Sequence, residues 1–378
     1  MARHRFSSTV IAICTTLIAC WSARAQNEIT KAHLEEYCDI LQLDDQAREL
    51  TTQLHRSYIA ARQQLREDIR ENRGKIDSED PVAFIQYNVD STTDLRNLNL
   101  RFLDDLALLT DSDDHIPRLQ IAHRRHQTLR GAYAMMTSAG STDMVMLAMS
   151  VVQPLRDEIE PQILQWEKEL DAVLVPFEQE NLRIGPVLVS TFGDVQAPEY
   201  RDMRLAREMH RHRVYPINMR IFAYLDTHTS EPDRTRIRRE FIERGANLPS
   251  SNIEAVCEQL LERDDIDDEL RQLCVKLRDE YRIAETPIIT GYIERDERFR
   301  HLNSMAAWGD DPELEMISPT LMDIQEQQEH TIAKLVDLRI LTAEKLKRVL
   351  NARDIEATID PQADVEKLAS DNLPYMPK

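Results

Sequence analysis

Glycine is scarce in this sequence, and its scarcity limits the possible folds more than any other feature. Only 8 of the 378 residues are glycine. Sheet-rich folds use glycine at tight turns, and phosphate-binding loops use it to bring backbone N–H groups close to the ligand. The common residues are leucine, arginine, glutamate, glutamine and alanine, which all favour helix. We therefore expect an all-α protein.

Apolar residues recur at the mixed three- and four-residue steps of a helix face along most of the chain. The first such face covers residues 29–73, with a break near Leu43 and Asp44, and Asp80 should cap a second helix that begins at Pro81. Further helices are expected from residue 116 to 131 or 136, and over residues 143–182, 199–226, 232–244, 252–263, 267–284 and 319–353. Long antiparallel helices of this kind predict an elongated helical bundle, built as one structure or as two helical units.

Prolines and glycines divide this helical chain. Pro154, Pro161 and Pro176 should bend or interrupt the helix over residues 143–182, and Pro287 should end another. Residues 184–198 hold two glycines, two prolines and a short apolar run. We expect a connector there, either between an N-terminal helical region (26–183) and a C-terminal one (199–353) or buried within one structure. The tail, residues 354–378, has three prolines and little periodicity, so we expect it to be poorly ordered.

Residues 1–25 have the three parts of a secretory signal. Arg3 and Arg5 provide a positive start, and an uncharged apolar run follows over residues 10–21. This run is shorter than the ~20 residues that a membrane-spanning helix needs. Small residues then precede a cleavage point after Ala25, which would leave Gln26 as the new N-terminus. We expect an exported protein, either periplasmic or secreted.

A second processing route fits the same segment. Leu17-Ile18-Ala19-Cys20 resembles the lipobox of bacterial lipoproteins, in which cleavage falls before a cysteine that carries lipid. Lipidation of Cys20 would tether the protein to a membrane, whereas cleavage after Ala25 would release it. The pattern leaves both routes open.

The charge of the chain limits its partners. The formal net charge is −20, and it becomes −23 without residues 1–25, which hold three arginines and no acidic residue. A strongly negative surface disfavours nucleic acid and anionic membrane surfaces as partners. We therefore expect no nucleic-acid partner, and membrane association only through lipid on Cys20. Protein clients or a second copy of the chain remain as partners.

Two cysteines lie on either side of an acidic turn at residues 264–268. Cys257 shares a helix face with Ile253 and Leu260, and Cys274 shares one with Leu270. If the two helices form an antiparallel hairpin, the two sulfurs face each other, and we expect a disulfide that contributes about 3 kcal/mol. One continuous helix is the alternative, and it would hold the cysteines too far apart to bond. Cys38 is left over, as a buried thiol or an intermolecular bridge.

Three segments resemble helix starts with a leading leucine, at residues 41–46, 108–113 and 341–345. A Thr or Asp follows the leucine in each and can cap free backbone N–H groups. They are similar to the Leu-Thr-x-x-Gln element of the Spy/CpxP-like periplasmic helical proteins. That resemblance implies an exported, all-helical protein, often dimeric, that binds unfolded proteins or senses envelope stress. Ala47, Asp113 and Lys345 stand where the element has Gln, and no site residue is carried over.

Three clusters could carry chemistry, and each has a structural interpretation that we prefer. The five methionines at 135, 136, 144, 146 and 149 could bind copper(I) through soft thioethers, but the apolar run around them is typical of a buried helix. His123 and His126 share a helix face beside arginines and no acidic residue, which predicts a surface or partly satisfied pair and no metal. The basic residues between Arg201 and Arg213 could hold an anion or acidic partner, but acidic helices packed beside them would neutralise them.

No catalytic, cofactor or metal motif stands out, so we expect no cofactor. The preferred function is a non-enzymatic binding or chaperone-like envelope protein that acts through exposed helix faces or an apolar groove. A metal-binding protein that uses the methionine-rich segment is one alternative, and an enzyme without a recognisable motif is another. Spatial catalytic groupings are invisible to sequence spacing, so the sequence leaves this third class open.

Overall fold

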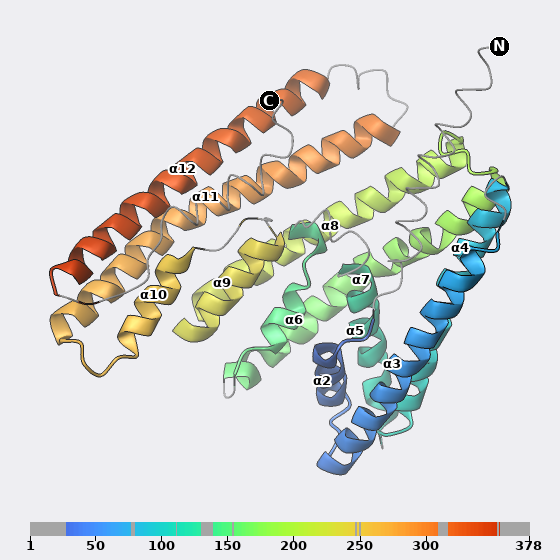
Figure 1. The fold of residues 1–378 in the computed structure, drawn as a ribbon, viewed down its shortest axis with the longest axis horizontal. Helices are drawn as coiled ribbons and strands as arrows, with labels where there is room; N and C mark the ends of the chain where they lie inside the picture. The colour runs from blue at the N-terminus through green and yellow to red at the C-terminus, as the bar shows by residue number, and fades with distance from the viewer. Residues whose placement is uncertain are drawn as a thin grey trace. The chain divides into compact units, whose positions relative to one another are not determined.

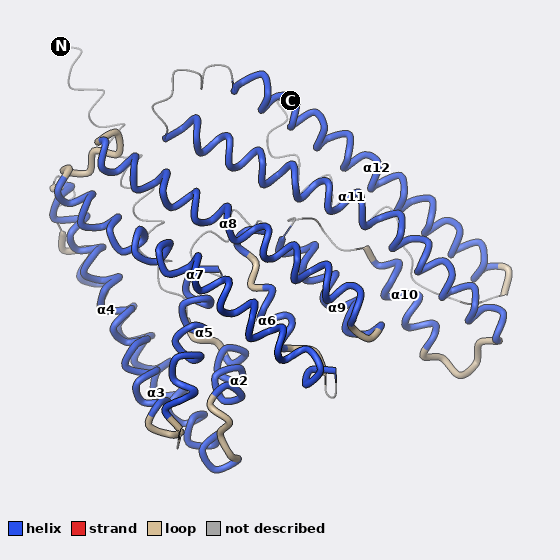
Figure 2. The backbone as a smooth tube through the Cα atoms, turned by 180° about the vertical axis from the view of Figure 1, so that it is seen from behind, coloured by secondary structure: helices blue, strands red, loops and turns tan. Residues whose placement is uncertain are grey.

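The computed structural model consists of helices joined by loops and turns over the residues that it describes (Figure 2). It describes residues 28–76, 80–110, 112–129, 139–152, 155–245, 248, 251–308, 317–353 and 355. These ranges contain no strand, so the all-α prediction is confirmed. None of their helices is apolar over a stretch long enough to cross a membrane. The expected signal segment, with Cys20 and the Ala25–Gln26 cleavage point, lies outside them. Of the expected tail, residues 354–378, only Ile355 lies within them.

The chain folds into two compact units that are interleaved in sequence. Unit 1 comprises Met1–Met136 and Glu158–Ile217, and unit 2 comprises Thr137–Asp157 and Asn218–Lys378. The expected connector at residues 184–198 is therefore internal to unit 1. Contacts between segments far apart in sequence decide this division, and local composition does not report them.

Unit 1 is built around the helix pair α3 and α4, which lie side by side in Figure 1. Asp44 caps α3 by accepting the Ala47 N–H at 2.8 Å, and Asp80 caps α4 by accepting the Ala83 N–H at 2.9 Å. Both caps confirm the predicted starts. The helices of unit 1 are α2 (Lys31–Ile40), α3 (Asp45–Arg73), α4 (Pro81–Ala107), α5 (Ile116–Leu129), most of α7 (Leu155–Ser190) and the first part of α8 (Pro198–His228).

Unit 2 is built around a second pair, α11 and α12, also side by side in Figure 1. Its helices are α6 (Met144–Met149), the end of α8, α9 (Glu231–Gly245), α10 (Asn252–Leu261), α11 (Asp268–Trp308) and α12 (Ile317–Asn351). The predicted break at Pro287 is wrong, because α11 continues through it. An internal proline costs a helix roughly 3 kcal/mol. The buried side chains Ile289 and Ile293 beyond it offset that cost by packing in the unit.

The segment expected as a connector is mostly helix. Residues 184–190 form the last turns of α7, where Ile184 and Leu188 are buried. The helix ends with Phe192 and Gly193 at positive φ, and the Gly193 N–H donates to the Leu188 carbonyl at 2.8 Å. This is a common way to satisfy the last carbonyls of a helix, and its glycine marks the helix end. The apolar run in this segment therefore belongs to a buried helix face.

Two of the three segments with a leading leucine precede helices, and the third does not. Asp44 caps α3, and the Ser112 side chain accepts the Asp114 N–H at the short helix before α5. Thr342 lies inside α12, where its hydroxyl donates to the Leu338 carbonyl at 2.8 Å. The predicted helix start at residues 341–345 is therefore wrong. A threonine in a helix interior can satisfy its own hydroxyl in this way, so Leu-Thr does not require a helix end.

The start of α3 recurs at the start of α11. Asp44 and Asp267 each accept a hydrogen bond from the backbone three residues further on, at 2.8 and 2.7 Å. Four residues after each cap is an arginine, Arg48 or Arg271, which donates to a backbone carbonyl of the preceding segment at 3.0 and 2.6 Å. The two helices thus begin with the same hydrogen-bond pattern. We call α3 with α4 hairpin 1, and α11 with α12 hairpin 2.

The buried faces of α3 and α11 also stay in register. Each helix has a buried tyrosine 14 residues after its capping aspartate: Tyr58 follows Asp44 in hairpin 1, and Tyr281 follows Asp267 in hairpin 2. One helical turn further on lies a buried charged residue, and its sign is opposite in the two hairpins: Arg62 in the first and Glu285 in the second. The two units therefore share one helical framework with different buried polar groups.

Candidate functional site

The two cysteines that the sequence singles out share one core. α10 and α11 fold back around residues 262–267, as the hairpin prediction requires, and Cys257 and Cys274 both lie in a buried cluster with Leu260 and Tyr281. Both are free thiols, so the predicted disulfide is absent from this structure. Burial raises the pKa of Cys257 to about 12 and also raises that of Cys274. Neutral buried thiols act as small apolar side chains, and Cys38 is a third buried free thiol.

The methionine-rich segment contributes to the core of unit 2. Met144 is fully buried in α6, whereas Met146 and Met149 are half-buried. The Asp143 side chain caps this short helix by accepting the Met146 N–H at 2.9 Å. Met135 and Met136 lie outside the described residues. Within those residues, no group of His, Cys, Asp and Glu side chains is arranged to hold a metal ion.

His123 and His126 belong to a buried polar cluster in unit 1. His126 is completely buried, so of the two predicted alternatives, a surface pair or a partly satisfied pair, the surface one is wrong. Its Nε2 lies 2.8 Å from a Glu36 carboxylate oxygen, and its Nδ1 lies 2.9 Å from the Tyr37 hydroxyl. The His33 ring stacks on it at a centroid distance of 3.9 Å. All three partners come from α2, which the spacing of residues along α5 does not reveal.

Buried arginines complete this cluster. Arg125 forms ion pairs with Glu36 and, at 3.4 Å, with Glu167, and Arg118 donates to the second Glu167 oxygen at 2.8 Å. Arg125, Glu36 and Glu167 are all buried, so each charge is balanced inside the protein. Burial, followed by the charges of Arg96 and Arg124, lowers the pKa of His123 to about 4. The cluster holds α2, α5 and α7 together and is not open to a substrate.

The basic residues of α8 are also engaged. The Arg207 guanidinium lies over the Phe177 ring at 5.5 Å, and Arg211 donates to Glu208 at 2.8 Å. Burial raises the pKa of Glu208, but the neighbouring arginines, led by Arg211, outweigh burial and lower it overall. Part of the charge that neutralises these arginines therefore comes from Glu208 on α8 itself. The prediction had placed this charge on acidic helices packed beside α8.

A larger network of buried charges lies in unit 2. Arg238 pairs with Glu254 at 3.6 Å and with Glu285 at 3.4 Å. Arg282 pairs with Glu254 at 3.2 Å, and Arg339 pairs with Glu285 at 3.3 Å. All five side chains are buried. They connect α9, α10, α11 and α12, and each of the five charges has an oppositely charged partner inside the unit.

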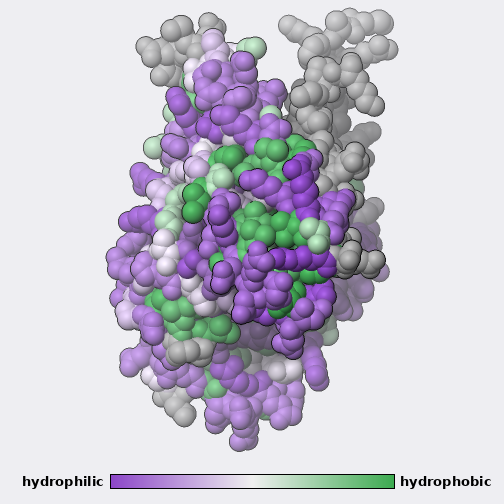
Figure 3. All heavy atoms as spheres, turned by 90° about the vertical axis from the view of Figure 1, so that its left-hand side faces the viewer, coloured by the Kyte–Doolittle hydropathy of each residue, from purple (hydrophilic) through white to green (hydrophobic). Residues whose placement is uncertain are grey.

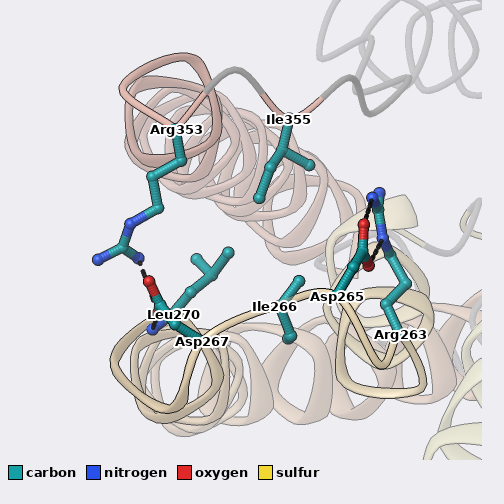
Figure 4. Close-up of a pocket in the computed structure, with 7 residues that line it drawn as sticks. All are labelled: Arg263, Asp265, Ile266, Asp267, Leu270, Arg353 and Ile355. Carbon is teal, nitrogen blue, oxygen red and sulfur yellow. Dashed lines mark hydrogen bonds and ion pairs between the residues drawn. The ribbon is translucent and has the colours of Figure 1, made fainter.

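An open cavity lies at the end of unit 2, beside the turn between α10 and α11. We call it the end cavity; its volume is about 730 Å³. Figure 4 shows Ile355, in the chain that follows α12, pointing toward Ile266 and Leu270. Ile266 and Leu270 are buried and Ile355 is half-buried, so these three form an apolar floor of small exposed area within a lining that is mainly polar. Its size falls within the range of about 300–1,000 Å³ typical of ligand sites.

Charged residues of both signs form the rim of the end cavity. Arg263 holds Asp265 in a two-pronged ion pair, with distances of 2.8 and 2.6 Å (Figure 4). Arg353 lies on the opposite side, 3.9 Å from Asp267 and 2.8 Å from Glu269. An apolar centre with a charged, solvent-accessible rim is the usual organisation of a protein-binding surface.

Sequence reasoning identified the acidic turn at residues 264–268 but not the cavity beside it. The turn between α10 and α11 spans residues 262–267, two more than the turn at residues 41–44 in unit 1. The added length and the return of the chain after α12 create the cavity. The pairing of Arg263 with Asp265 could be anticipated from their spacing, but the position of Arg353 could not.

Comparisons with known proteins identify no relative. No family model matches the chain, and no match is found among curated proteins or solved structures.

Proposed function

We propose that this chain is an exported, non-enzymatic binding protein of the chaperone-like kind, which binds unfolded segments of protein clients at the end cavity. The observation that carries the proposal is the combination of an apolar floor, formed by Ile266, Leu270 and Ile355, with a rim of opposite charges. An unfolded client exposes apolar side chains next to polar backbone and charged groups. The floor would take the apolar side chain, and the rim would take its neighbours.

The rest of the surface is consistent with a partner-binding role. Figure 3 shows one face that is mostly hydrophilic, with hydrophobic side chains gathered in separate patches. On hairpin 2, Ile283, Met322 and Leu341 are 76, 70 and 59% exposed. The net charge of −20 favours a soluble protein and clients that carry positive charge. This proposal agrees with the class that the Spy/CpxP resemblance implies.

The test is whether the protein suppresses the aggregation of an unfolded client, and whether the end cavity is responsible. Ile355→Glu places a charge on the apolar floor and should abolish most of the suppression. Leu108→Glu is the matched control, because Leu108 is 82% exposed at the end of hairpin 1. Circular dichroism should show that both variants keep the helical fold. The proposal fails if the wild type has no effect at a stoichiometric ratio, or if both variants lose activity equally.

Export is tested separately, by the intact mass of protein made with its full sequence in a bacterial host. A mature chain that begins at Gln26 supports release after Ala25, and a lipidated N-terminus at Cys20 supports a membrane tether. Each result is consistent with an envelope protein. A chain that still begins at Met1 would contradict export.

A further inference from the structure

A second cavity in unit 2 has a different chemistry from the end cavity. It lies between α11 and α12, and its volume is about 300 Å³. The residues that line it include Arg295, His330 and Lys334, with Thr331 and Gln327 beside them, and no carboxylate. In a chain with 67 acidic and 47 basic residues, a cavity lined only by neutral and basic groups is unusual. We call it the basic groove.

The basic side chains of the groove lack acidic partners within the described parts of the chain. Arg295, His330 and Lys334 form no ion pair there, in contrast to Arg238, Arg282 and Arg339 in the same unit. Uncompensated positive charge in a cavity attracts anions, because the low-dielectric walls concentrate its field. The groove is therefore an electrostatic exception within an acidic protein.

The Arg295 side chain is held in place inside the groove. Its Nη2 donates to the Thr331 hydroxyl at 2.5 Å, and that hydroxyl donates to the Gln327 carbonyl at 2.7 Å. Gly291 lies under the guanidinium, and a Cβ there would stand 3.4 Å from Nη2. The Arg295 Nε is buried and has no hydrogen-bond partner. A buried donor without an acceptor is costly, and an anion at the guanidinium edge would supply the acceptor.

We propose that the basic groove binds the phosphate group of a small phosphorylated ligand. Arg295 and Lys334 carry two positive charges beside the His330 ring, which exceeds what a single carboxylate needs. A phosphate monoester carries a charge of about −1.5 to −2 at pH 7 and offers three acceptor oxygens. Pro287 and Ile288 line the same cavity and can contact the organic part of the ligand. This site is separate from the end cavity and does not depend on the client-binding proposal.

Isothermal titration calorimetry of the full-length mature protein with inorganic phosphate tests this site, with acetate at equal ionic strength as the comparison anion. We expect phosphate to bind and acetate to bind at least tenfold more weakly. Lys334→Gln removes one charge-assisted contact, worth about 1.5–3 kcal/mol, and should weaken phosphate binding by about 10- to 100-fold. Lys334 is exposed, so this variant should fold normally.

Lys347→Gln is the matched control, because Lys347 is an exposed lysine on α12 that does not line the groove. It should leave phosphate binding unchanged. Arg295→Gln should weaken binding at least as much as Lys334→Gln. The proposal is overturned if phosphate does not bind, if acetate binds as tightly as phosphate, or if Lys347→Gln weakens binding as much as Lys334→Gln.

Discussion

Hairpin 1 and hairpin 2 place a buried tyrosine at the same position and satisfy it in different ways. In hairpin 1, the Tyr58 hydroxyl donates to the Asn99 side chain at 2.8 Å and accepts the Ile29 N–H at 3.1 Å. In hairpin 2, the Tyr281 hydroxyl donates to Glu285 at 2.5 Å, and Glu285 also pairs with Arg339. The same helical geometry thus accommodates a tyrosine bonded to an asparagine and a backbone N–H in hairpin 1, and a tyrosine bonded to a buried carboxylate of a charge network in hairpin 2.

The difference matters because the two kinds of contact respond differently to the loss of a partner. A neutral hydrogen bond contributes about 1 kcal/mol, and removing one partner costs about 1–3 kcal/mol when the other stays buried. Removing one member of a buried ion pair costs about 3–5 kcal/mol, because an uncompensated charge remains inside the protein. We therefore expect the loss of Glu285 from hairpin 2 to cost more than the loss of a single hydrogen-bond partner of Tyr58 in hairpin 1.

The largest effect should come from Glu285→Ala in hairpin 2. This change leaves Arg238 and Arg339 buried without their shared carboxylate, so the free energy of unfolding of unit 2 should fall by about 3–5 kcal/mol. Urea denaturation followed by circular dichroism measures the loss. Glu280→Ala is the control on the same helix, because the Glu280 side chain is 53% exposed and 3.9 Å from Lys276. It should cost less than about 1 kcal/mol. Equal losses would mean that the Glu285 network contributes no more than a surface pair.

Acid should destabilise unit 1 through His123. Its pKa is about 4 in the folded protein and 6.5 in the unfolded chain, so between these values the unfolded state binds more protons. The stability contribution is fully present above pH 6.5 and falls as the pH decreases toward 4, by about 3 kcal/mol in total. Urea denaturation at several pH values, followed by circular dichroism, measures this loss.

The His123→Gln variant should flatten this pH dependence, since it removes the titrating ring. His228→Gln should leave the dependence unchanged, because His228 is exposed on α8. If His123→Gln keeps the full pH dependence, another group in unit 1 causes the acid sensitivity.

The two buried tyrosines offer a smaller and more direct comparison. Tyr58→Phe removes a partner from both Asn99 and the Ile29 N–H, and should cost about 1–3 kcal/mol. Tyr281→Phe should cost less, because Glu285 keeps Arg339 and a second arginine as partners. Thermal and urea denaturation of the two variants measure the order. A larger loss for Tyr281→Phe would show that its hydroxyl is essential to the charge network.

The smallest effect is expected where one hairpin is made to resemble the other. Thr51 in hairpin 1 and Cys274 in hairpin 2 each lie seven residues after the capping aspartate, and both are buried. The Thr51 hydroxyl donates to the Ala47 carbonyl at 2.9 Å, and a threonine at 274 could donate to the equivalent Leu270 carbonyl. Cys274→Thr should therefore change the free energy of unfolding by less than about 1 kcal/mol. A loss well above that, in urea denaturation, would contradict the proposed equivalence of the two positions.

Local signals in the sequence predicted the helices well. The caps at Asp44 and Asp80 depend on a side chain and its own nearby backbone, so their residue types identify them. Thr342 and Pro287 depart from their predicted places at helix ends because tertiary packing overrides local preference, and a helix interior can accommodate both residues. The equal spacings from capping aspartate to tyrosine to buried charged residue in hairpin 1 and hairpin 2 are also present in the sequence. They become visible only when Asp267, among several neighbouring acids, is known to be the cap.

The polar clusters and the cavities were beyond sequence reasoning because distant segments build them. Glu36 and His126 are 90 residues apart in the chain. Their contact depends on how α2 packs against α5. The end cavity likewise requires Arg353 to return to the turn that holds Asp267. The predicted disulfide failed for a related reason. The sequence placed Cys257 and Cys274 on facing helices, but it did not show that their thiols would pack as apolar groups.

Hydrogen exchange with and without an unfolded client tests the central claim most directly, because it reports on both hairpins in one experiment. We predict that the client slows amide exchange at residues 262–270, which form the turn and part of the floor of the end cavity. The equivalent residues 41–48 at the start of hairpin 1 should exchange at the same rate with and without the client. Equal protection of both segments, or protection of residues 41–48 alone, would contradict the assignment of client binding to the end cavity.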